Sequence, residues 1–206
     1  MVQSIRSILW LLFVAVLVTP ATATEKPSFE NARVIKIPEG ISDISIGEGS
    51  GRQKFKVAKV RSAFNGSFAP TTYRFLYREI LGWREKVVWG TIPITWNPRV
   101  DPKTSVDRNF KHILPTYDGA ACNVADARLL ITGKGSAEKL LLIYANREFS
   151  RNIFGGEPIT FSVFDFFVYK EVNHGEARYF FRFRESFKTR EYYCDVNEAF
   201  EGEFGF

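Results

Sequence analysis

Histidine and cysteine are scarce in this sequence, which contains two of each. The histidines, His112 and His174, stand far apart, and neither belongs to an HxH or HExxH pattern. Metal sites normally combine several His, Cys, Asp or Glu ligands at helical or hairpin spacing. The sequence therefore predicts no metal site. It also predicts no nucleotide cofactor, because it has neither a Walker loop nor a G-x-G-x-x-G motif.

Signatures of nucleophilic catalysis are missing as well. No serine stands in a G-x-S-x-G motif, and the two cysteines do not form a CxxC pair. Carboxylates alone can still hydrolyse glycosides, because that reaction needs only two acids about 5–10 Å apart. Acids that could form such a pair are Asp101, Asp107, Asp118, Asp126, Glu148 and Asp165. Any protein of this size contains such residues, so their presence is weak evidence for an active site. We therefore expect a non-enzymatic protein and keep a carboxylate-based hydrolase of envelope polymers as the alternative.

The first 23 residues have the three parts of a secretory signal peptide. Arg6 supplies a positive charge, Ile8–Val18 is an unbroken apolar run, and Ala21-Thr22-Ala23 places small residues at a cleavage site after Ala23. The run of 11 residues is too short for a membrane-spanning helix, which needs about 20. No later stretch is long and apolar enough to be one. We expect an exported, periplasmic or secreted protein that is not transmembrane.

Removing this leader leaves 183 of the 206 residues, enough for a single domain with a sizeable core. We expect residues 24–32 to be a flexible lead-in and residues 33–206 to form one β-rich globular domain. Aromatic residues make up 16% of the chain, with 20 phenylalanines, and such side chains favour pleated, half-buried strands. The fold class expected is mainly β, an antiparallel sandwich-like or α+β domain. A short C-terminal helix should begin after Asp195, which can cap it.

The two cysteines, Cys122 and Cys194, should pair in an oxidising compartment. A bridge closing a loop of this length would stabilise the domain by about 4 kcal/mol. Reactive thiols, the functional alternative, would need a CxxC motif or a neighbouring base. The sequence therefore predicts a structural disulfide.

Strands are predicted from period-two alternation and from the turn residues between them. Thr72–Trp83 could be a strand or a short helix, and Pro93 predicts an edge or a bulge within Lys86–Trp96. Asp126–Thr132 and Lys139–Ala145 are apolar on both faces, which indicates a central hairpin. The other predicted strands are Arg33–Ile37, Ile41–Ile46, Arg52–Val60, Ile159–Val172 and Ala177–Arg190.

The last two strands should form a hairpin whose second strand alternates aromatic with basic residues. A turn at His174-Gly175 would place Arg178 opposite Glu171 and Arg184 opposite Asp165. On the other face, Phe181 would lie against Val168 and Phe183 against Phe166, with Tyr179 and Phe187 on the same aromatic face. The cations left without a facing acid, Arg182, Lys188 and Arg190, are the predicted binding residues for an anionic partner.

Without the leader the chain has 27 basic and 23 acidic residues, a net charge of +4. This balance is compatible with an anionic envelope component but does not require one. The partner could equally be a protein or a small molecule, and no nucleic acid is expected. The sequence does not define the oligomeric state.

Two segments, GAACNVADARLLITG at 119–133 and TREYYCDVNEAF at 189–200, resemble periplasmic proteins of the carbapenem intrinsic-resistance (self-protection) group. The resemblance covers about the last ninety residues. It implies a non-hydrolytic periplasmic protein that protects its producer from a β-lactam. We therefore expect an exported domain that acts by binding. The alternatives are the hydrolase above and an envelope subunit that pairs through exposed strand edges.

Overall fold

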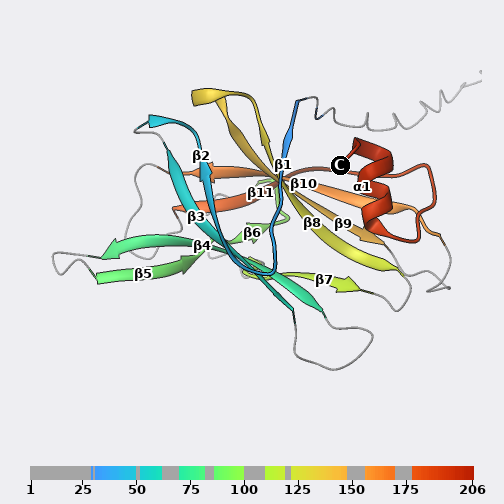
Figure 1. Ribbon diagram of the computed structural model, residues 1–206, viewed down its shortest axis with the longest axis horizontal. Helices are drawn as coiled ribbons and strands as arrows, with labels where there is room; N and C mark the ends of the chain where they lie inside the picture. Colours follow the sequence, from blue (N-terminus) through green and yellow to red (C-terminus); the bar gives the residue numbers. More distant parts are fainter. Residues whose placement is uncertain are drawn as a thin grey trace, which may run out of the picture.

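The computed structural model describes residues 29, 31–49, 52–61, 70–81, 86–99, 110–118, 122–147, 156–169 and 178–206. The predicted leader, most of the lead-in, Asn173–Glu176 and Glu171 lie outside these residues. The described elements are β1 (Arg33–Ile35), β2 (Gly40–Ile46), β3 (Gln53–Arg61), β4 (Thr71–Leu81), β5 (Lys86–Thr91), β6 (Ile94–Thr95), β7 (Leu114–Asp118), β8 (Asn123–Thr132), η2 (Gly135–Ala137), β9 (Lys139–Arg147), β10 (Ile159–Val168), β11 (Tyr179–Lys188) and α1 (Val196–Phe204). The predicted fold class, mainly β with a short C-terminal helix, is confirmed (Figure 1).

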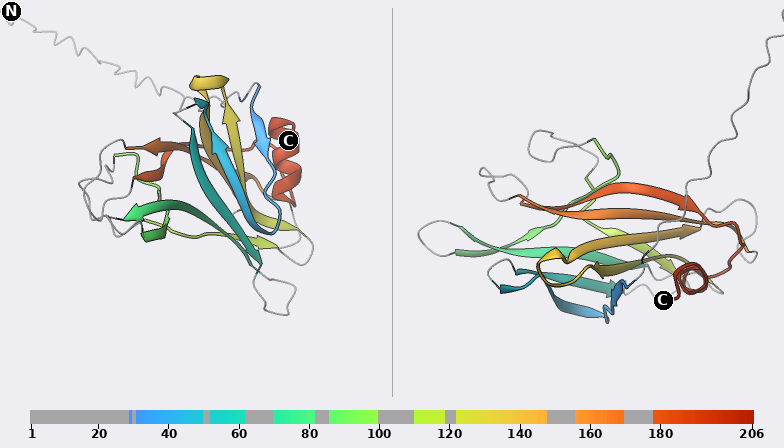
Figure 2. Two further views of the ribbon diagram at one scale, coloured as in Figure 1. Left: turned by 60° about the vertical axis from the view of Figure 1, so that its left-hand side comes forward. Right: turned by 90° about the horizontal axis from the view of Figure 1, so that it is seen from above.

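Two antiparallel sheets pack face to face. One sheet contains β2–β5, the other contains β8–β11, and β7 joins them by pairing with both β4 and β8. Across the interface, Phe75 of β4 lies 4.9 Å from Phe181 of β11 between ring centroids, and Phe55 of β3 stacks on Phe166 of β10 at 5.5 Å. Figure 2 shows β10 and β11 on one side of the molecule and β1 and β2 on the opposite side.

A second apolar core lies on the outer face of the β8–β11 sheet, beneath α1. Val196, Ala199 and Phe200 of the helix are fully buried there. The strands β8 and β9 therefore have buried residues on both faces, and their predicted central position is confirmed. Asp195 caps α1 as predicted, because its side chain accepts a hydrogen bond of 2.7 Å from the Asn197 amide.

The ambiguous segment Thr72–Trp83 is a strand over its described part, which ends at Leu81. Tyr73, Phe75 and Tyr77 alternate into the core between the sheets, while Arg74 and Arg78 are exposed. Pro93 interrupts the next predicted strand, since β5 ends at Thr91 and β6 begins at Ile94. β6 then pairs in parallel with β11.

The predicted register of the last hairpin is wrong, by two residues from Val168 to Phe164 and by one residue from Val163 onward. Asp165 lies opposite Arg182, and Phe166 lies opposite Phe181. A two-residue shift keeps every side chain on the same face of the sheet, so alternation in the sequence does not distinguish the two registers. The predicted Arg184–Asp165 contact is nevertheless present, at 3.4 Å, as a diagonal pair.

A β-bulge at Arg184 corrects a second expectation about this strand. Phe164 pairs with Phe183 and Val163 with Glu185, so Arg184 is the extra residue. The bulge exchanges the faces of the strand. Phe181 and Phe183 pack between the sheets, whereas Phe187 packs in the core beneath α1. The expected single aromatic face is therefore divided between two cores.

Candidate functional site

A cavity of about 390 Å³ opens at one end of the two sheets. Its wall comes from four places in the chain: the end of β2, the start of β3, the turn from η2 into β9, and the end of β10. The lining residues are Ile46, Gly47, Gln53, Ser136, Glu138, Lys139, Leu140, Asp165, Phe166, Phe167 and Val168. Apolar side chains and a few polar groups thus meet in a concave site, the usual composition of a small-molecule pocket.

Glu138 joins the elements on one side of the cavity. Its Oε2 accepts a hydrogen bond of 2.9 Å from the Gly47 amide, and its Oε1 lies 3.9 Å from the Arg33 guanidinium. Gly47 has a φ of +77°, a conformation that favours glycine and aims its amide at this carboxylate. The contact links the β2 turn to the start of β9 at the wall of the cavity.

The opposite side of the cavity rests on the aromatic core. Phe166 stacks on Tyr179 at 6.0 Å between ring centroids, and the Tyr179 hydroxyl donates a hydrogen bond of 3.1 Å to Gln53. Asp165 pairs with Arg184, whose Nε also lies 2.8 Å from Glu185. Contacts with neighbouring side chains therefore position Gln53 and Asp165 in this wall.

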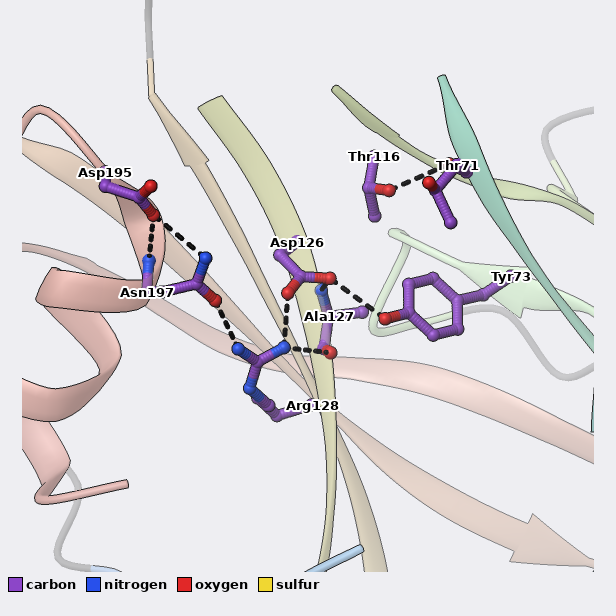
Figure 3. Close-up of polar contacts among 8 residues, drawn as sticks. All are labelled: Thr71, Tyr73, Thr116, Asp126, Ala127, Arg128, Asp195 and Asn197. Carbon is purple, nitrogen blue, oxygen red and sulfur yellow. Dashed lines mark hydrogen bonds and ion pairs between the residues drawn. The ribbon is translucent and has the colours of Figure 1, made fainter. Parts of the chain in front are cut away.

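A separate polar cluster lies near the N-terminus of α1 (Figure 3). The buried carboxylate of Asp126 accepts hydrogen bonds from the Tyr73 hydroxyl at 3.0 Å and the Ala127 amide at 2.8 Å, and it pairs with Arg128. Arg128 also bonds the Asn197 side chain and lies over the Phe200 ring at 4.9 Å. This cluster ties β4, β8 and α1 together, so Asp126 has a structural role.

The structure separates the three predicted binding residues. Arg182 is half-buried, faces Asp165 across the strands, and lies over the Phe167 ring at 4.0 Å. Lys188 and Arg190 are exposed, and the bulge at Arg184 places Lys188 on the opposite face of the sheet from Arg182. Binding of an anionic partner by these residues stays a prediction. Arg182 and Lys188, however, cannot contact that partner from the same face of the sheet.

The cysteines that were expected to pair are joined, with Cα atoms 5.5 Å apart. The disulfide connects the start of β8 to the segment before α1. Next to it, the fully buried Arg147 donates a hydrogen bond of 2.9 Å to the Cys194 carbonyl. The bridge and this arginine hold the C-terminal segment against the sheet.

The other predicted features and titratable groups add no second candidate site among the described residues. Among these residues, no group of three His, Cys, Asp or Glu side chains could hold a metal ion, and no helix is long and apolar enough to cross a membrane. Of the predicted carboxylates, Asp101, Asp107 and Glu148 lie outside the described residues. Burial, together with the neighbouring Glu203, raises the pKa of Tyr193, which donates a hydrogen bond of 3.2 Å to that carboxylate.

Sequence reasoning did not identify Glu138, Lys139 or Gln53 as site residues. Glu138 and Lys139 follow a glycine-containing connector, and Gln53 begins an amphipathic strand, so nothing in the sequence distinguishes them from solvated surface residues. Only the meeting of β2, β3, β9 and β10 brings them to one cavity.

The sequence matches no family model, and it matches no curated protein. Among solved structures, the crystal structure of CarG is similar to this chain, with a TM-score of 0.58 and 16% sequence identity. The similarity covers 82% of this chain and 94% of the CarG chain. At this level of identity the likeness concerns the fold alone, and the chain is similar in fold to CarG.

Proposed function

We propose that this chain is an exported, non-enzymatic domain that acts by binding, as a periplasmic protective or inhibitory protein of the carbapenem-resistance type. Two similarities support the proposal. Segments 119–133 and 189–200 resemble that group in sequence, and the fold is similar to that of CarG along most of both chains. The disulfide is compatible with an oxidising compartment such as the periplasm.

The observation that carries the proposal is the cavity between the ends of the sheets. Its volume, about 390 Å³, is within the range of sites that bury a small molecule. Phe166, Phe167 and Leu140 supply apolar surface, and Lys139 supplies a cation at the wall. A carbapenem is a compact bicyclic β-lactam that carries a carboxylate, so an apolar wall with one cation complements its size and its charge.

The contacts of the two cavity carboxylates favour binding over catalysis. Glu138 accepts a backbone hydrogen bond and lies near Arg33, and Asp165 pairs with Arg184. A general base needs a carboxylate that can reach a substrate or water proton. Here both groups are held by protein partners, which suits a structural role in the cavity wall.

Calorimetric titration of the exported protein with a carbapenem tests the proposal. We expect saturable binding and no opening of the β-lactam ring, which ultraviolet absorbance follows in the same samples. Lys139→Glu should weaken binding about tenfold or more, because it replaces a charged partner of the ligand carboxylate by a repelling group. Lys134→Glu is the matched control, since Lys134 is an exposed lysine of the same connector that does not line the cavity.

Two outcomes would contradict the proposal. Absence of binding would remove the small-molecule function. Turnover of the carbapenem would instead favour an enzyme.

The alternative hydrolase of envelope polymers has one specific observation in its favour, since Glu138 and Asp165 line the same cavity. Release of soluble fragments from purified envelope polymers, lost in both Glu138→Gln and Asp165→Asn, would establish that alternative.

A further inference from the structure

The outer face of the β2–β5 sheet is a described surface that the proposed function leaves unexplained. Phe55, Val57, Phe75 and Tyr77 point into the core between the sheets. Because side chains alternate along a strand, the residues between them point outward. This outward face lies on the far side of the sheet from β10 and β11 (Figures 1 and 2). The proposed cavity is lined from the ends of the sheets and includes none of the outward residues of this face.

Cations dominate this outward face. Lys54, Arg74 and Arg78 are exposed, and Lys56 is half-buried. Asp43 is the single acid at the outward positions of the described parts of these strands, and its Oδ1 lies 2.6 Å from the Lys56 ammonium. Four cations against one acid leave an excess positive charge on a surface that crosses several strands.

Large apolar side chains are exposed on the same face. Trp89 of β5 lies directly opposite Arg78 of β4, is 49% exposed, and has the Lys56 ammonium 5.4 Å from its ring centroid. Ile41 and Val60, at other positions of this face, are 67% and 51% exposed. Together with the cations, these side chains give the face both apolar and positively charged groups.

A surface of this composition suits the interface of an anionic bilayer. Tryptophan prefers the headgroup level of a membrane, and lysine and arginine side chains bury their apolar stems while their charges reach lipid phosphates. Each cation near an anionic surface strengthens the association about fivefold. Single-stranded nucleic acid, by contrast, is bound by several aromatic side chains in series, and Trp89 is the one exposed aromatic at the described outward positions of this face.

We propose that the β2–β5 outer face docks on the surface of a bilayer that contains anionic phospholipid, with Trp89 and Ile41 in the headgroup region. The cations Lys54, Arg74 and Arg78 face the lipid phosphates. The chain then lies on the membrane surface with no segment of this sheet crossing it. The cavity stays accessible to solvent, so the two binding functions can operate together.

Flotation with phospholipid vesicles tests this docking. The exported protein is mixed with vesicles of equal parts phosphatidylglycerol and phosphatidylcholine, or of phosphatidylcholine alone. We expect association with the anionic vesicles only, weakening as salt is raised, because exposed charges are screened over about 8 Å at physiological ionic strength. The triple variant Lys54→Gln, Arg74→Gln, Arg78→Gln should bind at least tenfold more weakly.

A matched control removes the same charge from exposed positions elsewhere, in the triple variant Lys36→Gln, Lys134→Gln, Arg178→Gln. It should change binding to the anionic vesicles less than twofold. Trp89→Ala should weaken binding even at high salt, where charge contributes little. Equal losses in the two triple variants, or no association with anionic vesicles, would overturn the proposal. Self-association that disappears in the Lys54, Arg74 and Arg78 variant, without vesicle binding, would instead assign the face to a second copy of the chain.

Discussion

Gly90 of β5 lies directly beneath the ring of Tyr77 on the neighbouring strand β4. The two residues are paired across the ladder, and a Cβ added at Gly90 would lie 2.4 Å from the Tyr77 ring. Tyr77 cannot move away freely, since it is buried and packs on Tyr179 with ring centroids 5.0 Å apart. A glycine at this position therefore lets an aromatic ring of the core lie flat against the next strand.

Gly90→Ala should lower the free energy of unfolding by about 1–3 kcal/mol, because the new methyl group overpacks the Tyr77 ring. Denaturant unfolding measures the change. The control is a double-mutant cycle with Tyr77→Leu, a smaller side chain that leaves room for the methyl group. If Gly90→Ala costs as much in the Tyr77→Leu background as it does beside the native tyrosine, the ring contact is not the cause.

Asp126→Ala should lower the free energy of unfolding by about 3 kcal/mol. The change removes the carboxylate partner of Arg128, which keeps its hydrogen bond to Asn197, and it removes the acceptor of the Tyr73 and Ala127 hydrogen bonds. Asp165→Ala is the comparison, and it should cost less than about 1 kcal/mol because both side chains of its ion pair are about one-third exposed. Similar losses in the two variants would show that burial does not determine the contribution of these pairs.

Replacing both cysteines by alanine should lower the stability of the domain by about 4 kcal/mol, since the disulfide restricts a long loop of the unfolded chain. Thermal unfolding followed by circular dichroism measures the loss. Ligand binding at low temperature should remain, because neither cysteine lines the cavity. Free thiols found by peptide mapping of the unreduced protein would contradict the pairing.

Tyr193 should make stability fall at alkaline pH. Burial and Glu203 raise its folded-state pKa above the unfolded value of about 10, so the folded state keeps the phenolic proton to higher pH. The contribution is complete below pH 10 and is lost as pH rises through the folded pKa, because the unfolded state then binds fewer protons. Tyr193→Phe should reduce this decline, measured as the difference in denaturant midpoints between neutral and alkaline pH. An unchanged decline would exclude Tyr193 as its source.

Cleavage after Ala23 tests the signal-peptide interpretation, and with it the prediction that the protein is exported. Intact-mass measurement of the protein recovered from the periplasm or medium should give a chain that begins at Thr24. An Ala21→Leu, Ala23→Leu variant should accumulate in the uncleaved form, because the peptidase requires small residues at these positions. A mature chain that still contains Ile8–Val18 would contradict the signal-peptide interpretation.

The sequence by itself determined most of the strands, the class of the fold, and the cap of α1. It did not predict β7, which joins the two sheets, and it left Thr72–Trp83 open between a strand and a helix. Alternation such as that of Phe55 and Val57 with Lys54 and Lys56 is a local property, and it indicates a strand whatever lies opposite. The acceptor at Asp195 is equally local, since it bonds the amide of Asn197 two residues along the chain.

Only the tertiary structure decided the register of β10 and β11, the bulge at Arg184, and the cavity. A shift of two residues conserves the inward face, so the competing registers bury the same side chains and differ only in how they pack against the other sheet. Glu138 and Asp165 meet at one cavity because β9 begins and β10 ends beside the β2–β3 turn. That placement depends on the packing of the two sheets as whole layers, which no local pattern of residues encodes.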